Sequence, residues 1–204
     1  RLRLSAELVR DAALAASGLL DTRVGGKSVY PPLPPGVGEL GYQGTKWPTS
    51  KGRDLYRRGL YVFFQRTTPY PQLATFDAPD SLLACSRRER STTPLQALNL
   101  LNDSVFFEAA QGLAARIIRS NSGTFQEELH HAFLLCLARG PSKDESERLM
   151  QFYQLQRKLL SKDHTAAEGL FPAKGVEGIN VTEAAVWVSL SRVLLNLDEF
   201  ITRE

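Results

Sequence analysis

The chain has 204 residues, of which 43% are hydrophobic and 23% are charged, and its formal net charge is +3. This composition is typical of a globular protein that buries a core of its own. No run of about 18 apolar residues is present, so no membrane span is expected, and so small a net charge argues against binding to nucleic acid. Because the chain begins at Arg1, without a methionine, we expect it to be a piece of a longer protein, folded as a single domain over 1–204.

The first predicted element is a helix over 6–17, with Ser5 as its N-cap and Gly18 at its C-terminal end. Apolar residues recur on one face at helical spacing, and Arg10 and Asp11 lie off that face. The predicted apolar face consists of Leu4, Leu8, Ala12, Ala15 and Leu19.

Residues 21–52 are rich in proline and glycine, which excludes a regular helix or a central strand. The segment also contains Tyr30, Tyr42 and Trp47, so we expect a long ordered loop that packs against the body. Its Gly25-Gly26-Lys27-Ser28 run lacks the preceding strand and the glycine spacing of a phosphate-binding loop.

A stretch from Arg53 to Arg90 combines arginine with tyrosine and phenylalanine. Its guanidinium groups either tie loops together, through bonds to carboxylates and carbonyls, or present a site for an anion. We favour the first interpretation because Asp54, Asp77, Asp80 and Glu89 alternate with the arginines. The candidate binding residues of the stretch are Arg57, Arg58, Tyr61, Arg66, Tyr70, Asp77, Arg87, Arg88 and Arg90.

The apolar residues after Asp54 fit two local structures. Leu55, Leu60 and Phe63 give a helical stripe that would end at Pro69, whereas the apolar run over 59–64 also fits a short buried strand. We favour the helix because the neighbouring elements are helical. A short helix from Asp77 to about 87 is expected next.

The rest of the chain predicts helices that begin at good N-caps. Pro94 follows a run of hydroxyl residues and suits a first helical turn, with Leu95, Leu98 and Leu101 as the apolar face. Ser142 and Glu145 have the spacing of a capping box. The predicted ranges are about 94–102, 104–120, 124–138, 142–160 and 182–198, with a loop over 161–179, so the fold class is mainly α.

The search for catalytic and metal-binding residues gives few candidates. His130 and His131 are adjacent on a predicted helix and point about 100° apart, so no metal site is predicted. Asp77 fits a general acid or base, or a helix cap. Cys85 and Cys136 would either form a disulfide or remain free, with Cys136 buried in an apolar helix, and their spacing fits no zinc motif. No catalytic residue and no cofactor are assigned to this chain.

Several blocks of the sequence together resemble a known family. The blocks GGKSVYPP, YRRGLYVFFQRTTPYP, FDAP and CSRRERSTTPLQALNLLND, in this order, are similar to the planctomycete domain of unknown function 1553, the PSD-one family, over nearly the whole chain. The resemblance implies the C-terminal part of a large extracytoplasmic protein, periplasmic or secreted, with a link to polysaccharide breakdown and often a c-type cytochrome domain. Any haem would belong to another part of the parent protein, because C-x-x-C-H is absent here.

We therefore expect a non-catalytic binding or assembly module, with the upstream domains of the same polypeptide, and possibly polysaccharide, as partners. The alternative is part of an enzyme acting on polysaccharide, whose active site is completed by upstream residues. A cleft that combines Arg58, Arg66 and Asp77 would favour the enzyme, and arginines paired within the fold would favour the module.

Overall fold

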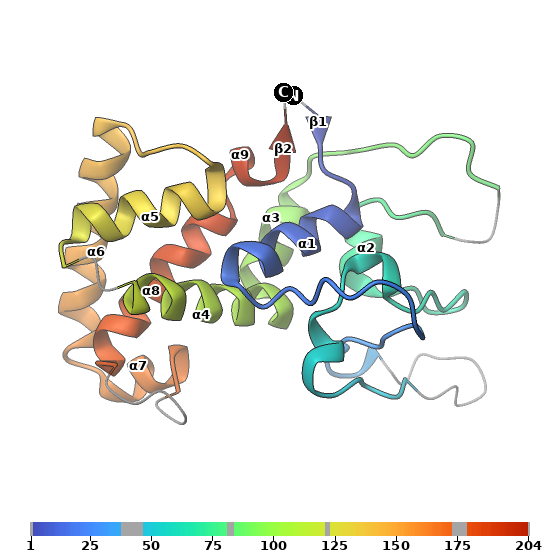
Figure 1. The fold of residues 1–204 in the computed structure, drawn as a ribbon, viewed down its shortest axis with the longest axis horizontal. Helices are drawn as coiled ribbons and strands as arrows, with labels where there is room; N and C mark the ends of the chain where they lie inside the picture. The colour runs from blue at the N-terminus through green and yellow to red at the C-terminus, as the bar shows by residue number, and fades with distance from the viewer. Residues whose placement is uncertain (1, 38–46, 81–83, 121–122, 173–178, 204) are drawn as a thin grey trace.

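The computed structural model describes residues 2–37, 47–80, 84–120, 123–172 and 179–203, and these form a mainly helical body (Figure 1), which confirms the predicted fold class. The α-helices are α1 (Ala6–Ser17), α2 (Pro71–Thr75), α3 (Pro94–Asn102), α4 (Ser104–Arg119), α5 (Phe125–Leu137), α6 (Lys143–Leu160), α7 (His164–Leu170), α8 (Val181–Leu195) and α9 (Asp198–Ile201). Two 3-10 turns, η3 (Gly52–Tyr56) and η4 (Gly59–Tyr61), and two short strands, β1 (Leu2–Arg3) and β2 (Thr202–Arg203), complete the described part.

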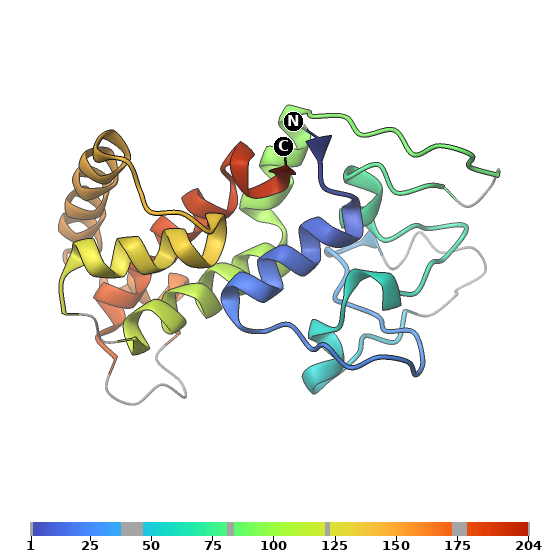
Figure 2. The same ribbon diagram turned by 45° about the horizontal axis from the view of Figure 1, so that its top comes forward.

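Helices α4 and α8 form the centre of the core. Leu113 and Ile117 of α4 and Trp187 and Leu190 of α8 are inaccessible to solvent. Helices α1 and α5 pack against α4, while α6 and α7 pack against α8. Figures 1 and 2 place α5 to α8 on one side of the molecule and the loop-rich segments 19–37, 47–80 and 84–93 on the other, with α1 and α4 between them.

The two ends of the described chain meet in the small sheet. Strand β1 pairs antiparallel with β2, with Leu2 opposite Arg203 and Arg3 opposite Thr202. The first and last elements therefore lie side by side (Figure 2).

The well-capped helices are confirmed. Asp103, Thr124, Ser142 and Asn180 each accept a hydrogen bond from a backbone N–H in the first turn of α4, α5, α6 and α8, respectively. Each side chain satisfies a donor that the helix itself leaves free. The predicted helix over 182–198 is two helices, α8 and α9, and α7 lies within the loop predicted over 161–179, of which 173–178 fall outside the described residues.

The helix predicted after Asp54 is wrong. The backbone of this segment bonds to the preceding loop instead of to itself: Asp21 N–H donates to Tyr56 O, Val29 N–H to Tyr61 O, and Phe63 N–H to Val29 O. These bonds leave only η3 and η4 as helical turns. The helix expected from Asp77 is also wrong, because α2 ends before it and Asp77 has a φ of 60°, which does not continue a right-handed helix; residues 81–83 fall outside the described part.

The described parts of the Pro/Gly-rich loop, 21–37 and 47–51, contain no α-helix and pack against the body. Trp47 lies parallel to Tyr70, with ring centroids 6.0 Å apart, and Tyr30 stacks on Phe63 at 4.9 Å. Residues 38–46, with Tyr42, fall outside the described residues.

Two helices bury a different face from the one predicted. On α1, Leu8 and Ala15 are exposed, whereas Arg10 and Asp11 are buried. On α3, Leu95 is 69% exposed and Leu98 55%, whereas Gln96 is 1% exposed. In both cases the polar side chain finds partners inside: Arg10 donates to Leu55 O at 2.6 Å, Asp11 Oδ1 accepts from Gly59 N–H at 2.6 Å, and Gln96 donates to Thr75 O at 3.0 Å.

Candidate functional site

The guanidinium of Arg57 occupies a cup of backbone carbonyls. It is buried and donates to the carbonyl oxygens of Arg23 (3.0 Å), Gly25 (2.5 Å) and Lys27 (3.2 Å), and it lies 3.8 Å from the ring centroid of Tyr61. The Tyr61 hydroxyl accepts a hydrogen bond from Gly25 N–H at 2.7 Å. Because the loop turns its carbonyls toward a cation, it is not arranged as an anion cradle, in which N–H groups converge.

Arg58 and Arg88 bind two acidic residues of α1. Arg58 Nε donates to Asp11 Oδ2 at 3.0 Å. Arg88 Nη1 donates to both carboxylate oxygens of Glu7, at 2.9 and 3.1 Å. These contacts fasten the arginine stretch to the first helix from two points.

Arg66 and Arg87 differ from the other candidates. Both are exposed, and within the described part of the chain their side chains have no hydrogen bond or ion pair. Tyr70 is buried and donates to Pro32 O at 3.4 Å. The candidate residues are therefore spread over separate places instead of meeting in one cleft.

A fourth group forms around Asp77 and includes a residue that the sequence analysis missed, Arg3. Its side chain is 2% exposed and donates to Asp77 Oδ2, to Ser91 O at 2.6 Å, to Leu4 O at 2.9 Å and to Phe76 O at 3.2 Å. Asp77 also accepts from the N–H and the hydroxyl of Ser91, and Arg90 donates to Arg3 O at 3.0 Å. A single arginine in a two-residue strand carries no periodic signal by which sequence could have identified it.

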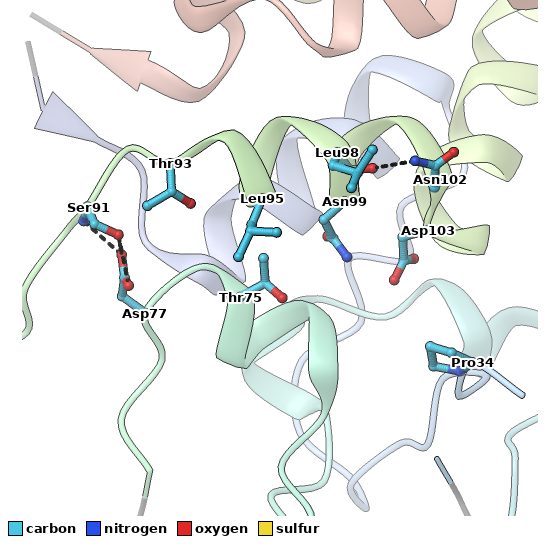
Figure 3. A pocket seen from close by; sticks show the side chains of 10 residues that line it. All are labelled: Pro34, Thr75, Asp77, Ser91, Thr93, Leu95, Leu98, Asn99, Asn102 and Asp103. Carbon is cyan, nitrogen blue, oxygen red and sulfur yellow. Dashed lines mark hydrogen bonds between the residues drawn. The ribbon is translucent and has the colours of Figure 1, made fainter. Parts of the chain in front are cut away.

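Beside this group lies a groove along α3 with a volume of about 500 Å³ (Figure 3). Asp77 and Ser91 lie at one end, Asp103 at the other, and Leu95 and Leu98 lie between them on the exposed face of α3. The remaining lining residues are Pro34, Thr75, Thr93, Asn99 and Asn102. Of the residues predicted from the sequence, the groove contains Asp77 but not Arg58 or Arg66.

The pKa values of the two carboxyl groups in the groove are shifted in opposite directions. Partial burial raises the pKa of Asp77, but the hydrogen bonds from Ser91 and the charge of Arg3 outweigh it, so the pKa lies below its ordinary value. Burial raises the pKa of Asp103 and dominates over the lowering by Val105 N–H, Arg10 and Asn99. Arg10 is fully buried behind Asp103, and its own pKa is lowered, chiefly by desolvation.

The cysteines are not bridged, an outcome that the sequence analysis left open: Cys85 is exposed, and Cys136 is buried as predicted. Burial raises the pKa of the Cys136 thiol to about 12, which makes it unreactive at neutral pH. Among the described residues no group of three or more His, Cys, Asp or Glu side chains could hold a metal ion. Nor does any described helix combine the length and apolar character needed to cross a bilayer.

Comparison with known proteins gives a family match. A family model described as "Protein of unknown function (DUF1553)" matches residues 1–153, which is three quarters of the chain and includes the whole arginine stretch, α1 to α5 and the groove. Searches of curated proteins and of solved structures found no match.

Proposed function

The chain belongs to the DUF1553 family, and we propose that it is a non-catalytic binding or assembly module that docks a partner along the groove of α3. The observation that carries this proposal is the orientation of α3, which exposes Leu95 and Leu98 and buries Gln96. Adjacent leucines at i and i+3 form one apolar patch on a helix. Such a patch at the mouth of a groove gains free energy when a partner covers it.

The pairing of the arginines within the fold supports a binding or assembly module and argues against an active-site cleft lined by free cationic side chains. Arg57, Arg58, Arg88 and Arg90 all donate to groups of this chain. Their role in this proposal is to hold the loop region against α1 and β1, so that the groove keeps its shape.

We take the partner to be another part of the same longer polypeptide, as the family resemblance implies. The proposal includes a location outside the cytoplasm. A c-type haem, if the parent protein has one, would belong to that other part. Fractionation of cells that produce the full-length parent checks the location: recovery in the cytoplasmic fraction would contradict it.

Thiol footprinting tests the docking surface. We replace Cys85 by Ser, introduce Leu98→Cys on α3 or, as a matched control, Leu155→Cys on α6, where Leu155 is 53% exposed, and measure labelling by a maleimide. In this chain alone both thiols should react at similar rates. In the full-length parent the thiol at position 98 should react at least about tenfold more slowly, because the partner covers it, while the control stays unchanged. Equal labelling of position 98 in both forms would refute docking at α3.

One observation favours a second candidate, part of an enzyme acting on polysaccharide. Asp77 and Asp103 line the same groove with pKa values shifted in opposite directions, and a pair of carboxyl groups with separated pKa values is the usual acid and base of glycoside hydrolysis. The test is release of reducing ends from neutral and acidic glycans by the full-length parent. An active parent that loses activity with Asp103→Asn, without loss of stability, would favour the enzyme over the module.

A further inference from the structure

We infer that the occupant of the α3 groove is a polypeptide segment in which two basic side chains flank apolar ones. This inference rests on the docking function proposed above and names the chemistry of the partner. It is carried by the charge, the hydrogen-bonding capacity and the length of the groove.

The charge of the groove is negative at both ends. Figure 3 shows Asp77 below Ser91 at the start of α3 and Asp103 after its last turn, with the leucine patch between them. The arginines that balance these carboxylates lie behind them: the Arg3 side chain is 2% exposed and Arg10 is inaccessible, whereas the Asp77 side chain is 30% exposed. A ligand in the groove therefore meets carboxylates and not guanidinium groups, so a cationic side chain is favoured at each end.

The hydrogen-bonding groups of the groove are mainly acceptors. Three of its donors are engaged within the fold: the Ser91 hydroxyl donates to Asp77, the Thr75 hydroxyl to Pro71 O, and Asn102 Nδ2 to Leu98 O. By contrast, Asn99 Oδ1 is buried and has no hydrogen-bond partner. Ammonium and guanidinium groups are donors without acceptor capacity, and they match this lining better than a carboxylate, a sulfate or a hydroxyl group.

The aliphatic character of the patch favours a polypeptide over an amino sugar. Leu95 and Leu98 offer branched alkyl groups, on which the methylene stem of lysine or arginine packs while its charged head reaches a carboxylate. Helix α3 has 9 residues, or about 13 Å at 1.5 Å per residue. An extended segment covers this length in about four residues at 3.3 Å each, so the two basic residues should lie about four positions apart.

Fluorescence anisotropy with three labelled synthetic peptides tests the inference on the chain. One peptide has two lysines separated by three leucine or alanine residues, the second has glutamates in place of the lysines, and the third has serines. The lysine peptide should bind at least about tenfold more tightly than the other two, and its affinity should fall as salt rises, because ion pairs at the surface are screened. Equal affinities, or tighter binding of the glutamate peptide, would overturn the inference.

Two variants locate the binding. Asp103→Asn removes a charge from the groove but retains an N-cap side chain for α4. It should weaken binding of the lysine peptide at least about fivefold and leave the melting temperature close to that of the parent chain. Leu98→Gln should weaken the binding of all three peptides, and the matched Leu155→Gln on α6 should weaken the binding of none. Lysine-peptide binding that neither groove variant changes would mean a site elsewhere and would reject the inference.

The outcomes separate the two proposals. If the thiol at position 98 is protected in the full-length parent but the chain does not prefer the lysine peptide, docking stands and the basic occupant is wrong. If position 98 is not protected, the docking function itself fails. A glucosamine oligomer is added to the anisotropy experiment as a competitor, and displacement of the lysine peptide at lower concentrations than the unlabelled peptide requires would identify a glycan occupant and reject the polypeptide.

Discussion

At the scale of single residues, we predict opposite effects on stability when either of two buried arginines among the first ten residues is replaced. Arg3 is held by four hydrogen-bonding partners, one of them the carboxylate of Asp77. Arg10 donates one hydrogen bond, to Leu55 O, and its Nε and Nη1 atoms are buried without a partner. Both side chains are buried, so the two arginines differ in how many of their hydrogen-bond donors have a partner.

Arg3→Met should lower the free energy of unfolding by about 2–3 kcal/mol, because Ser91 O and Phe76 O lose a donor in a partly buried place and Asp77, although it keeps the hydrogen bonds from Ser91, loses its counter-charge. Urea denaturation measures this change. The matched control is Arg87→Ala, which removes an exposed arginine and should stay within about 0.5 kcal/mol. A loss no larger than that of the control would contradict a structural role for Arg3.

Arg10→Met should change the free energy of unfolding by less than about 1 kcal/mol or increase it, since the loss of one hydrogen bond is offset by removal of a desolvated charge with two unpaired nitrogen atoms. The same urea titration measures it. A loss of about 3 kcal/mol or more, on the scale of a broken buried ion pair, would mean that the charge of Arg10 is needed behind Asp103.

At the scale of elements, we predict that the contact between α5, α6 and α9 is sensitive to acid. Arg139 donates to Glu145 at 2.8 and 2.9 Å and to Glu199 at 2.6 and 2.8 Å. The Arg139 hydrogen bond, together with the capping contacts of Ser142, outweighs desolvation and lowers the pKa of Glu145 from 4.5 to about 2. The unfolded chain therefore binds more protons than the folded chain between these values, so this contribution is present above about pH 4.5 and is lost as the pH falls to about 2.

Glu145→Gln isolates the charge, because glutamine can still complete the capping box with Ser142. We expect the variant to melt at a lower temperature than the parent chain at pH 6, with the difference shrinking through pH 4 and 3 and closing near pH 2. Melts followed by circular dichroism at these values measure it. A difference in melting temperature that does not depend on pH would show that the hydrogen bonds, and not the charge, stabilise the junction.

The contact between η4 and α1 is tight enough to exclude a side chain at Gly59. A Cβ atom there would lie 2.7 Å from Glu7 Cα and 2.8 Å from Glu7 O, which are backbone atoms of α1 and its first turn. Gly59→Ala should therefore cost about 1–3 kcal/mol in the free energy of unfolding, the usual range for an overpacked site.

The matched control is Gly169→Ala in α7, where nothing lies within 4 Å of the added atom. Alanine has the higher helix propensity, so this variant should gain up to about 1 kcal/mol. If Gly59→Ala were as stable as this control, the approach of η4 to α1 would have to be looser than described.

Sequence predicted the elements best where the signal is local. Ser142 and Glu145 mark the start of α6 because both partners of the capping box lie in one helical turn. The faces of α1 and α3 were predicted wrongly because their polar residues are satisfied from far along the chain, Asp11 by Gly59 and Gln96 by Thr75. The same long-range bonding replaced the expected helix after Asp54. The groove was therefore beyond prediction except for Asp77, since it depends on which face of α3 is turned outward.

At the scale of the whole molecule, the hydrophobic core extends beyond the region that the family model matches. The matched region ends at residue 153, within α6, yet α8 lies at the centre of the core against α4. Trp187, Leu190 and Leu194 of α8 are inaccessible to solvent. The region that the family model covers therefore contains only one of the two helices at the centre of the core.

A chain cut after residue 153 should consequently lack a cooperative fold, although it retains the groove and the arginine stretch. Without α8, α4 loses the helix against which it packs at the centre of the core, and burial of side chains such as Leu113 and Ile117 contributes roughly 1.5–3 kcal/mol each. We expect the 1–153 fragment to bind the dye ANS, to lose its near-ultraviolet circular dichroism and to be cleaved by protease within α4. The matched control is the full chain with Trp187→Ala, which should lose about 3–5 kcal/mol but still unfold in one transition. A 1–153 fragment that melts in a sharp transition, with protected amides in α4, would mean that α8 is an addition to an independent domain and not its centre.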